Sequence, residues 1–161
     1  MAGEHKYLQA MALVRDGLSA QESGDLDRAI QLYSESLTLC PTAEGHTFLG
    51  WALSYQGDLE QAIEHCRDAI ALDPEFGNPY NDIGVYLMQR DQFDEAIPWL
   101  EQAKAARRYE PRHFPYLNLG RIYMVRGELL RAVKEFEGAL QIAPDDDGIR
   151  QIIAGLRAKL N

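Results

Sequence analysis

The sequence has no long apolar segment. No stretch approaches the roughly 20 consecutive apolar residues that a membrane-crossing helix needs, so we expect no membrane insertion. The first residues, MAGEHKYLQAMALV, lack a cationic segment followed by an apolar block and a small-residue cleavage site, which argues against a secretory signal. The sequence therefore predicts a cytoplasmic protein.

Residue patterns that carry chemistry are also scarce. The only two cysteines, Cys40 and Cys66, sit at apolar positions of helical patterns, which predicts buried reduced thiols rather than a zinc site. The four histidines are scattered along the chain at positions 5, 46, 65 and 113. None has a cysteine or carboxylate at metal-ligand spacing on one helix face, and no glycine-rich phosphate loop is present. These absences predict a protein without enzymatic activity, cofactor or bound metal.

Positive charge is scarce in most of the chain. The net charge is −9; residues 1–100 carry 17 acidic but only 5 basic side chains, whereas residues 101–161 carry 8 acidic and 11 basic ones. Because nucleic acids are attracted by strongly positive surfaces, we expect no nucleic-acid partner. The asymmetry either orients a charged partner along the chain or reflects only solvated helix faces.

What the sequence does have is an internal repeat, in which small and apolar residues recur every 33 to 36 positions. The register is set by Gly17, Gly50, Gly84 and Gly120. Other columns in that register are Leu26, Leu59, Phe93, Leu129; Ala29, Ala62, Ala96, Ala132; Ile30, Ile63, Ile97, Val133; Tyr33, Cys66, Leu100, Phe136; and Ser36, Ala69, Ala103, Ala139. Apolar residues within a unit fall at three- and four-residue steps, as in an amphipathic helix. Each unit therefore predicts two helices that cross closely at the small residues.

Turn-forming residues mark where these helices end. Gly24, Gly57 and Gly127 fall at the joint between the two helices of a unit, where glycine adopts a left-handed backbone conformation at least cost. Asp91 holds that place in the third unit, and aspartate tolerates the conformation better than most residues. After the fourth unit, the acidic run 145–147 suits a helix N-terminus and precedes an apolar stripe, which predicts a closing helix.

The stretches FLGWALSYQGDLEQAIEHCRDAIALDP and YLNLGRIYMVRGELLRAVKEFEGALQIAP resemble the tetratricopeptide repeat. The resemblance implies an all-α fold: a right-handed superhelical α-solenoid of four tetratricopeptide-type helix pairs with a concave inner face, plus a C-terminal capping helix. We place the units at approximately 10–42, 43–76, 77–112 and 113–146 and the capping helix at 147–161, within one repeat domain of residues 1–161. In the third unit Arg108 stands where the other units end in proline, and two extra residues displace the proline to Pro111. This departure predicts an irregular joint before the fourth unit.

The resemblance also implies that the first helix of each unit lines the concave face, where the family binds extended peptides or helices. Candidate groove residues are Phe48, Trp51, Tyr55, Asn78, Asn81, Asp82, Met88, Phe114, Asn118 and Arg121. Asparagine can both donate to and accept from a ligand's backbone, and exposed aromatic clusters are typical interface anchors. For Phe48, Trp51 and Phe114 the alternative is that they fill gaps between adjacent units.

The predicted function is a scaffold or adaptor that binds a segment of a partner protein in this groove. One alternative is a secretion-type chaperone that shields an apolar export substrate, and another is a structural repeat protein that assembles into a homo-oligomer. A basic cluster surrounds the irregular joint and comprises Lys104, Arg107, Arg108 and Arg112. This cluster either binds an acidic segment of a partner or is a solvated helix end.

Overall fold

Residues 2–161, which the computed structural model describes, form nine α-helices and no sheet. The helices are α1 (Ala2–Glu22), α2 (Leu26–Leu39), α3 (Ala43–Tyr55), α4 (Leu59–Leu72), α5 (Asn78–Gln89), α6 (Phe93–Ala105), α7 (Phe114–Val125), α8 (Leu129–Ile142) and α9 (Asp147–Leu160). The predicted all-α solenoid is confirmed.

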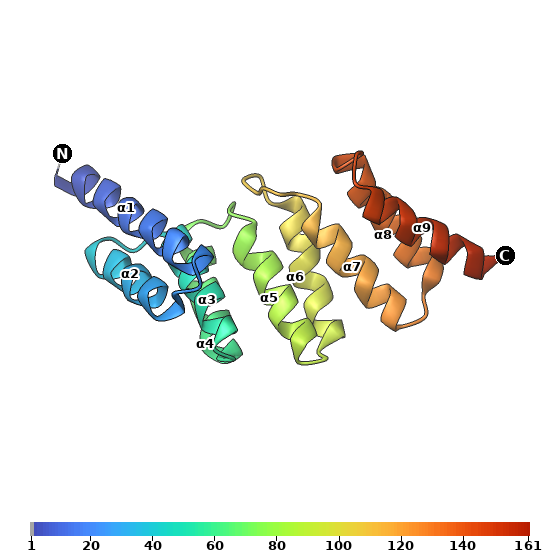
Figure 1. Cartoon of the computed structure of the whole chain (residues 1–161), viewed down its shortest axis with the longest axis horizontal. Coiled ribbons are helices and arrows are strands. Elements are labelled where there is room, and N and C mark those ends of the chain that lie inside the picture. Colours follow the sequence, from blue (N-terminus) through green and yellow to red (C-terminus); the bar gives the residue numbers. More distant parts are fainter. Residues whose placement is uncertain (1) are drawn as a thin grey trace.

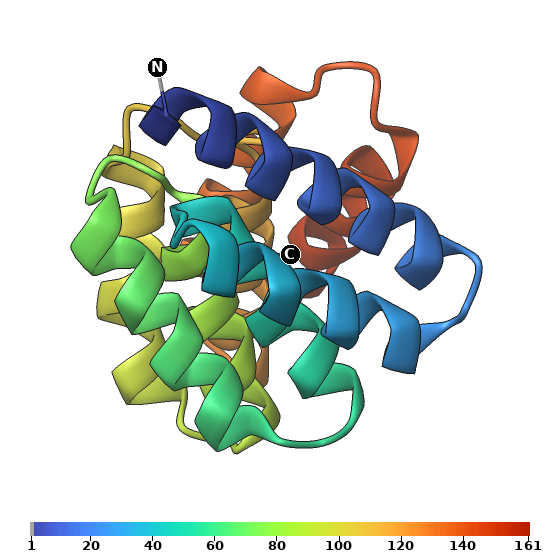
Figure 2. The same cartoon turned by 90° about the vertical axis from the view of Figure 1, so that its left-hand side faces the viewer.

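The helices are arranged as consecutive antiparallel pairs that stack side by side from the N-terminal to the C-terminal end (Figure 1). Viewed from the N-terminal end, successive pairs are turned relative to one another (Figure 2). The odd-numbered helices α1, α3, α5 and α7 also touch their counterparts in the next pair, whereas α2, α4, α6 and α8 do not touch one another. The array therefore curves with the odd-numbered helices on its inner side.

The repeat columns of the sequence are the contacts inside each pair. A methyl group added to Gly17, Gly84 or Gly120 would lie within 3 Å of the paired helix's Tyr33, Leu100 or Phe136 side chain, and one added to Gly50 would lie 2.9 Å from the carbonyl oxygen of Ala62. The side chains opposite these glycines are almost fully buried: Tyr33, Cys66, Leu100 and Phe136. Helices separated by so little space tolerate no larger residue, which explains why glycine recurs.

The residues at the helix joints behave as the sequence predicts. Asp91 has a φ of 59°, and Gly24, Gly57 and Gly127 have φ values between 72° and 86°. At the C-terminal end, the Asp146 side chain accepts a hydrogen bond from the backbone N–H of Ile149 and so caps α9. Helix α9 then packs on α8 through Ile149, Ile153 and Leu156, which covers the apolar face that the last pair would otherwise expose.

Two regions depart from a regular repeat. Helix α1 begins at Ala2, well before residue 10, where the repeat pattern places the start of the first unit. The side chains of residues 3–9 are exposed, so they leave no trace in the repeat pattern. The predicted irregular joint is the segment 106–113 between α6 and α7, which contains a cis peptide bond before Pro111. This segment lies beside the loop between α4 and α5, where Arg108 N donates to Glu75 O and Gly77 N donates to Arg108 O, both at 2.9 Å.

Candidate functional site: the concave groove

A cavity of about 550 Å³ opens on the inner side of the array, along helices α3, α5 and α7. Its lining residues come from these three helices and from the 106–113 joint: Thr47, Phe48, Trp51, Ser54, Tyr55, Asn78, Asn81, Asp82, Val85, Tyr86, Gln89, Tyr109, Pro111, Phe114 and Asn118. Each helix contributes residues at three- and four-residue steps, so one face of each helix points into the same space. We call this cavity the groove.

The N-terminal wall of the groove is aromatic. Phe48, Trp51 and Tyr55 follow one another along α3, with ring centroids 6.5 Å apart for the first two and 5.7 Å apart for the last two. Phe48 also stacks on Tyr33 at 6.1 Å, so its ring contributes both to the core and to the groove. Tyr55 is 66% exposed, and at the opposite end of the groove Phe114 is 44% exposed. The groove thus offers apolar surface to a ligand at both ends.

The floor of the groove is built from amides. Asn118 Nδ2 donates to Asn81 Oδ1 at 3.0 Å, which links α7 to α5, and both side chains are buried. Arg121 Nη1 donates to Asn118 Oδ1 at 3.1 Å and fixes the orientation of that amide. Asn78 lies at the beginning of α5, where its Nδ2 reaches the carbonyl of Glu110 at 3.5 Å. The amides are therefore held in place before any ligand arrives.

Two further polar groups of the groove are partly or fully removed from water: Asp82 is half-buried, and the Tyr86 hydroxyl is buried. Burial raises the pKa of the Asp82 carboxyl to about 7, although a hydrogen bond with Asn81 acts in the opposite direction. The Tyr86 hydroxyl is buried without a hydrogen-bond partner at normal distance among residues 2–161; burial, with Asp82 nearby, raises its pKa far above the usual value, although the neighbouring Ser54 hydroxyl acts in the opposite direction. This hydroxyl is shielded from solvent, so its burial without a partner is a cost to the fold rather than a contact offered to a ligand.

Eight of the ten candidate residues line the groove; the other two are Met88 and Arg121. Met88 packs against the core cluster of α4 to α7 instead. Arg121 is exposed and reaches the groove only through Asn118. The sequence reading did not identify Tyr86, Tyr109 or Pro111 as groove residues, because Tyr86 follows the core pattern of α5 and the other two lie in the irregular joint.

The four cations of the basic cluster all have acidic neighbours within the chain, but Lys104 lies in the last turn of α6 and Arg107 is largely exposed, so the binding of an acidic segment by this cluster stays a prediction. Arg108 pairs with Glu44 at 2.9 Å and with Asp73 at 2.5 Å, and its guanidinium lies over the Phe76 ring. The other three cations also have acidic partners: Lys104 pairs with Glu135 and Glu101, Arg107 with Glu75, and Arg112 with Glu110. Arg108 thereby ties the joint to α3 and to the end of α4.

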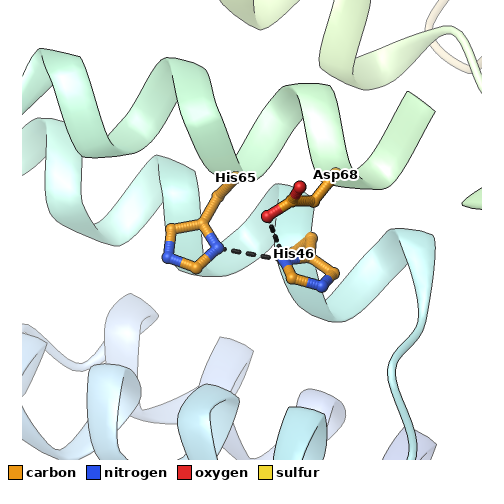
Figure 3. Close-up of side chains that lie close together, drawn as sticks. All are labelled: His46, His65 and Asp68. Carbon is orange, nitrogen blue, oxygen red and sulfur yellow. Dashed lines mark hydrogen bonds and ion pairs between the residues drawn. The ribbon is translucent and has the colours of Figure 1, made fainter. Parts of the chain in front are cut away.

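The prediction that the histidines lie apart from potential metal ligands is wrong for two of them. His46 on α3 and His65 on α4 face each other, with their Nδ1 atoms 3.0 Å apart, and Asp68 lies one turn further along α4 (Figure 3). His65 and Asp68 are three residues apart, which places them on one helix face. The spacing of His65 and Asp68 within α4 was thus visible in the sequence, but the third side chain, His46, comes from the paired helix α3.

Comparison with known sequences identifies the repeat. Family models described as tetratricopeptide repeat match residues 43–76, 80–108 and 115–146. The chain belongs to the tetratricopeptide repeat family. These matches begin at α3, and the structure folds α1 and α2 in the same antiparallel way as the later pairs (Figure 1).

Photosystem I assembly proteins named Ycf3 are among its relatives. The chain is 33% identical over 106 residues to the photosystem I assembly protein Ycf3 of Synechococcus sp. (strain CC9902), covering 59% of this chain and 61% of that protein. It is 32% identical over 120 residues to Ycf3 of Prochlorococcus marinus (strain MIT 9211), covering 65% of this chain and 69% of the relative. The chain therefore spans about three fifths of the length of the first of these relatives.

Solved structures of tetratricopeptide repeat proteins share the fold over nearly the whole chain. The structure of Pseudomonas aeruginosa PilF superposes with a TM-score of 0.88 at 22% identity, covering 99% of this chain and 71% of the other. PilW, a type IV pilus biogenesis factor, superposes with a TM-score of 0.81 at 17% identity, covering 92% of this chain and 69% of the other. Among the described helices of this chain, none has the length and apolar character to cross a membrane.

Proposed function

We propose that this protein is a non-catalytic adaptor that binds a segment of a partner protein in the groove. The observation that supports this most directly is the composition of the groove: exposed aromatic rings at both ends, with positioned amides between them. Aromatic anchors supply most of the binding energy at protein interfaces, and fixed amides recognise the backbone of an extended ligand.

The groove favours a neutral or basic segment with apolar side chains. Asp82 lines the groove, and no cation among residues 2–161 offsets the effect of its burial. A cationic ligand group beside Asp82 would stabilise the ionised carboxylate, whereas an acidic one would be repelled by it. The acidic excess of residues 1–100 attracts the same kind of ligand over a longer range.

The relatives suggest in which setting such a segment is bound. Ycf3 is named as an assembly protein for photosystem I. We infer that this chain likewise holds a segment of a subunit during the assembly of a larger complex. A groove that combines pre-positioned polar groups with exposed rings suits this task, because it binds one segment specifically and releases it without covalent chemistry.

The experiment replaces Tyr55 with alanine, because this ring is exposed and makes little contribution to the core. Crosslinked complexes captured from the source cell are compared between the wild type, Tyr55→Ala and Tyr7→Ala, the last removing an exposed tyrosine of α1 outside the groove. We expect about a tenfold loss of the captured partner for Tyr55→Ala. Tyr7→Ala should capture as the wild type does.

Two outcomes would contradict the proposal. Equal capture by all three proteins would show that the partner does not use the groove. Capture of only further copies of this chain, together with a molar mass that grows with concentration, would favour the self-assembling alternative.

A further inference from the structure

Two histidines and an aspartate of the pair α3–α4 converge outside the groove (Figure 3). Nδ1 of His46 lies 3.0 Å from Nδ1 of His65 and 3.8 Å from Oδ2 of Asp68. We propose that these three side chains bind a divalent transition-metal ion of the Zn²⁺ type, with water in the remaining coordination position.

The distances suit a tetrahedral ion. Bonds of 2.0–2.1 Å to nitrogen and oxygen place neighbouring ligand atoms of a tetrahedral zinc site about 3.4 Å apart. The three ligand atoms here all lie within 4.8 Å of one another. The two nitrogen atoms need to separate by only a few tenths of an ångström, and the Asp68 carboxylate, whose side chain is 62% exposed, is free to move towards them.

The protonation of the two rings fits the same role. Burial lowers the pKa of both imidazoles, and that of His46 is lowered further by the neighbouring His65 ring, although Asp68 acts in the opposite direction on both. Neutral imidazole is the form that ligates metals. In a metal-free pair only one of the two facing nitrogen atoms carries a hydrogen, which allows a single hydrogen bond. An ion between them would be coordinated by both nitrogen lone pairs, and the carboxylate would neutralise part of its charge.

The scaffold holds the ligands on rigid elements. His46 and Gly50 lie one turn apart on α3, and the Cβ of His65 lies 3.5 Å from where a Cβ on Gly50 would stand. The two helices therefore approach closely at this point, and neither histidine is carried by a loop. Since α3 also carries the groove aromatics, an ion here would tie the wall of the groove to α4.

The ligand set selects among metals. Two nitrogen atoms and one oxygen suit Zn²⁺, Co²⁺, Ni²⁺ or Cu²⁺, whereas Mg²⁺ and Ca²⁺ require shells made almost entirely of oxygen. We therefore expect Zn²⁺ to bind and Mg²⁺ to leave the protein unchanged.

The test uses the full chain without an affinity tag, stripped with a chelator and then titrated with Zn²⁺ by calorimetry. We expect one ion per chain and, at saturation, a rise of roughly 5 °C in melting temperature. Asp68→Asn should weaken Zn²⁺ binding at least about tenfold. His65→Ala should abolish it. Substituting Co²⁺ for Zn²⁺ should give the visible absorption of a tetrahedral site in the wild type and none in His65→Ala.

His5→Ala and His113→Ala are the matched controls, because each removes a histidine outside the cluster and should leave Zn²⁺ affinity unchanged. Absence of Zn²⁺ binding by the wild type would overturn the proposal. The same holds if Asp68→Asn and His65→Ala bind as tightly as the wild type, or if a control variant removes the binding. Asp68 is exposed, so its amide variant keeps the fold and the result remains interpretable.

Discussion

The Asp82 carboxyl makes the stability of the protein depend on pH in a specific direction. Its pKa is about 7 in the folded protein against an ordinary 3.8, with burial as the main cause. The unfolded chain therefore releases this proton near pH 4, whereas the folded chain retains it until about pH 7. Between these values the unfolded state binds fewer protons, so the contribution of Asp82 to the free energy of unfolding falls as pH rises. Asp82→Asn removes this pH-dependent decrease in the free energy of unfolding while keeping the shape of the side chain.

The size of the effect follows from the difference between the two pKa values. Each pKa unit corresponds to about 1.4 kcal/mol, so a difference of about three units sets a ceiling of ~4 kcal/mol above pH 7. The side chain is only half-buried, so water reaches part of the carboxylate and screens the penalty. We expect Asp82→Asn to stabilise the protein by roughly 1–3 kcal/mol at pH 8 and by less at pH 5.

Urea unfolding followed by circular dichroism at pH 5 and pH 8 measures this difference. Asp16→Asn is the matched control, because Asp16 is an exposed carboxylate of α1 to which the same substitution applies. Its stability relative to the wild type should be nearly the same at both pH values. The reasoning is refuted if the advantage of Asp82→Asn does not grow between pH 5 and pH 8, or if the variant is less stable than the wild type at pH 8.

Three further predictions concern packing and ion pairs, and urea unfolding checks each of them. Arg108→Ala should destabilise the protein by about 1–2 kcal/mol, because its guanidinium forms two ion pairs and lies over an aromatic ring. Arg107→Ala removes only one exposed ion pair and should cost less than about 0.5 kcal/mol. Gly50→Ala should cost about 1–3 kcal/mol, since the new methyl group meets a backbone oxygen, whereas Gly155→Ala, with open space around it, should stabilise α9 by up to ~1 kcal/mol. Ala62→Arg should prevent folding, and a soluble, fully helical variant would contradict the packing described here.

The sequence predicted the fold well because the repeat is imposed by close packing. A column such as Ala29, Ala62, Ala96 and Ala132 is fully buried in every pair, so its residues are constrained in the same way each time. The start of α1 could not be predicted in this manner, because side chains that face solvent are free to vary. A repeat pattern therefore reports the core of a helix and misses its exposed extensions.

The groove was predicted less completely, for a physical reason as well. Asn81 and Asn118 were identified as groove residues, but their hydrogen bond to each other depends on how α5 and α7 are placed in space. The pairing of His46 with His65 likewise joins two different helices, because the two residues are 19 positions apart in the sequence. Sequence spacing shows which residues share one helix face. It does not show which faces of different helices meet, and contacts such as the Asn118–Asn81 hydrogen bond depend on that.

The positions that set the groove's chemistry are those that the repeat leaves free. Gly50 and Gly84 occupy equivalent places and fix how closely α3 and α5 approach their partners. The residues that follow them, Trp51 and Val85, both line the groove but differ in size and character. Since the glycines determine the backbone and their neighbours determine the surface, we expect an exchange of Trp51 to change what the proposed groove binds without changing the fold. We therefore expect the specificity of the proposed groove to depend on a few side chains of its inner face, most of them in the second and third helix pairs.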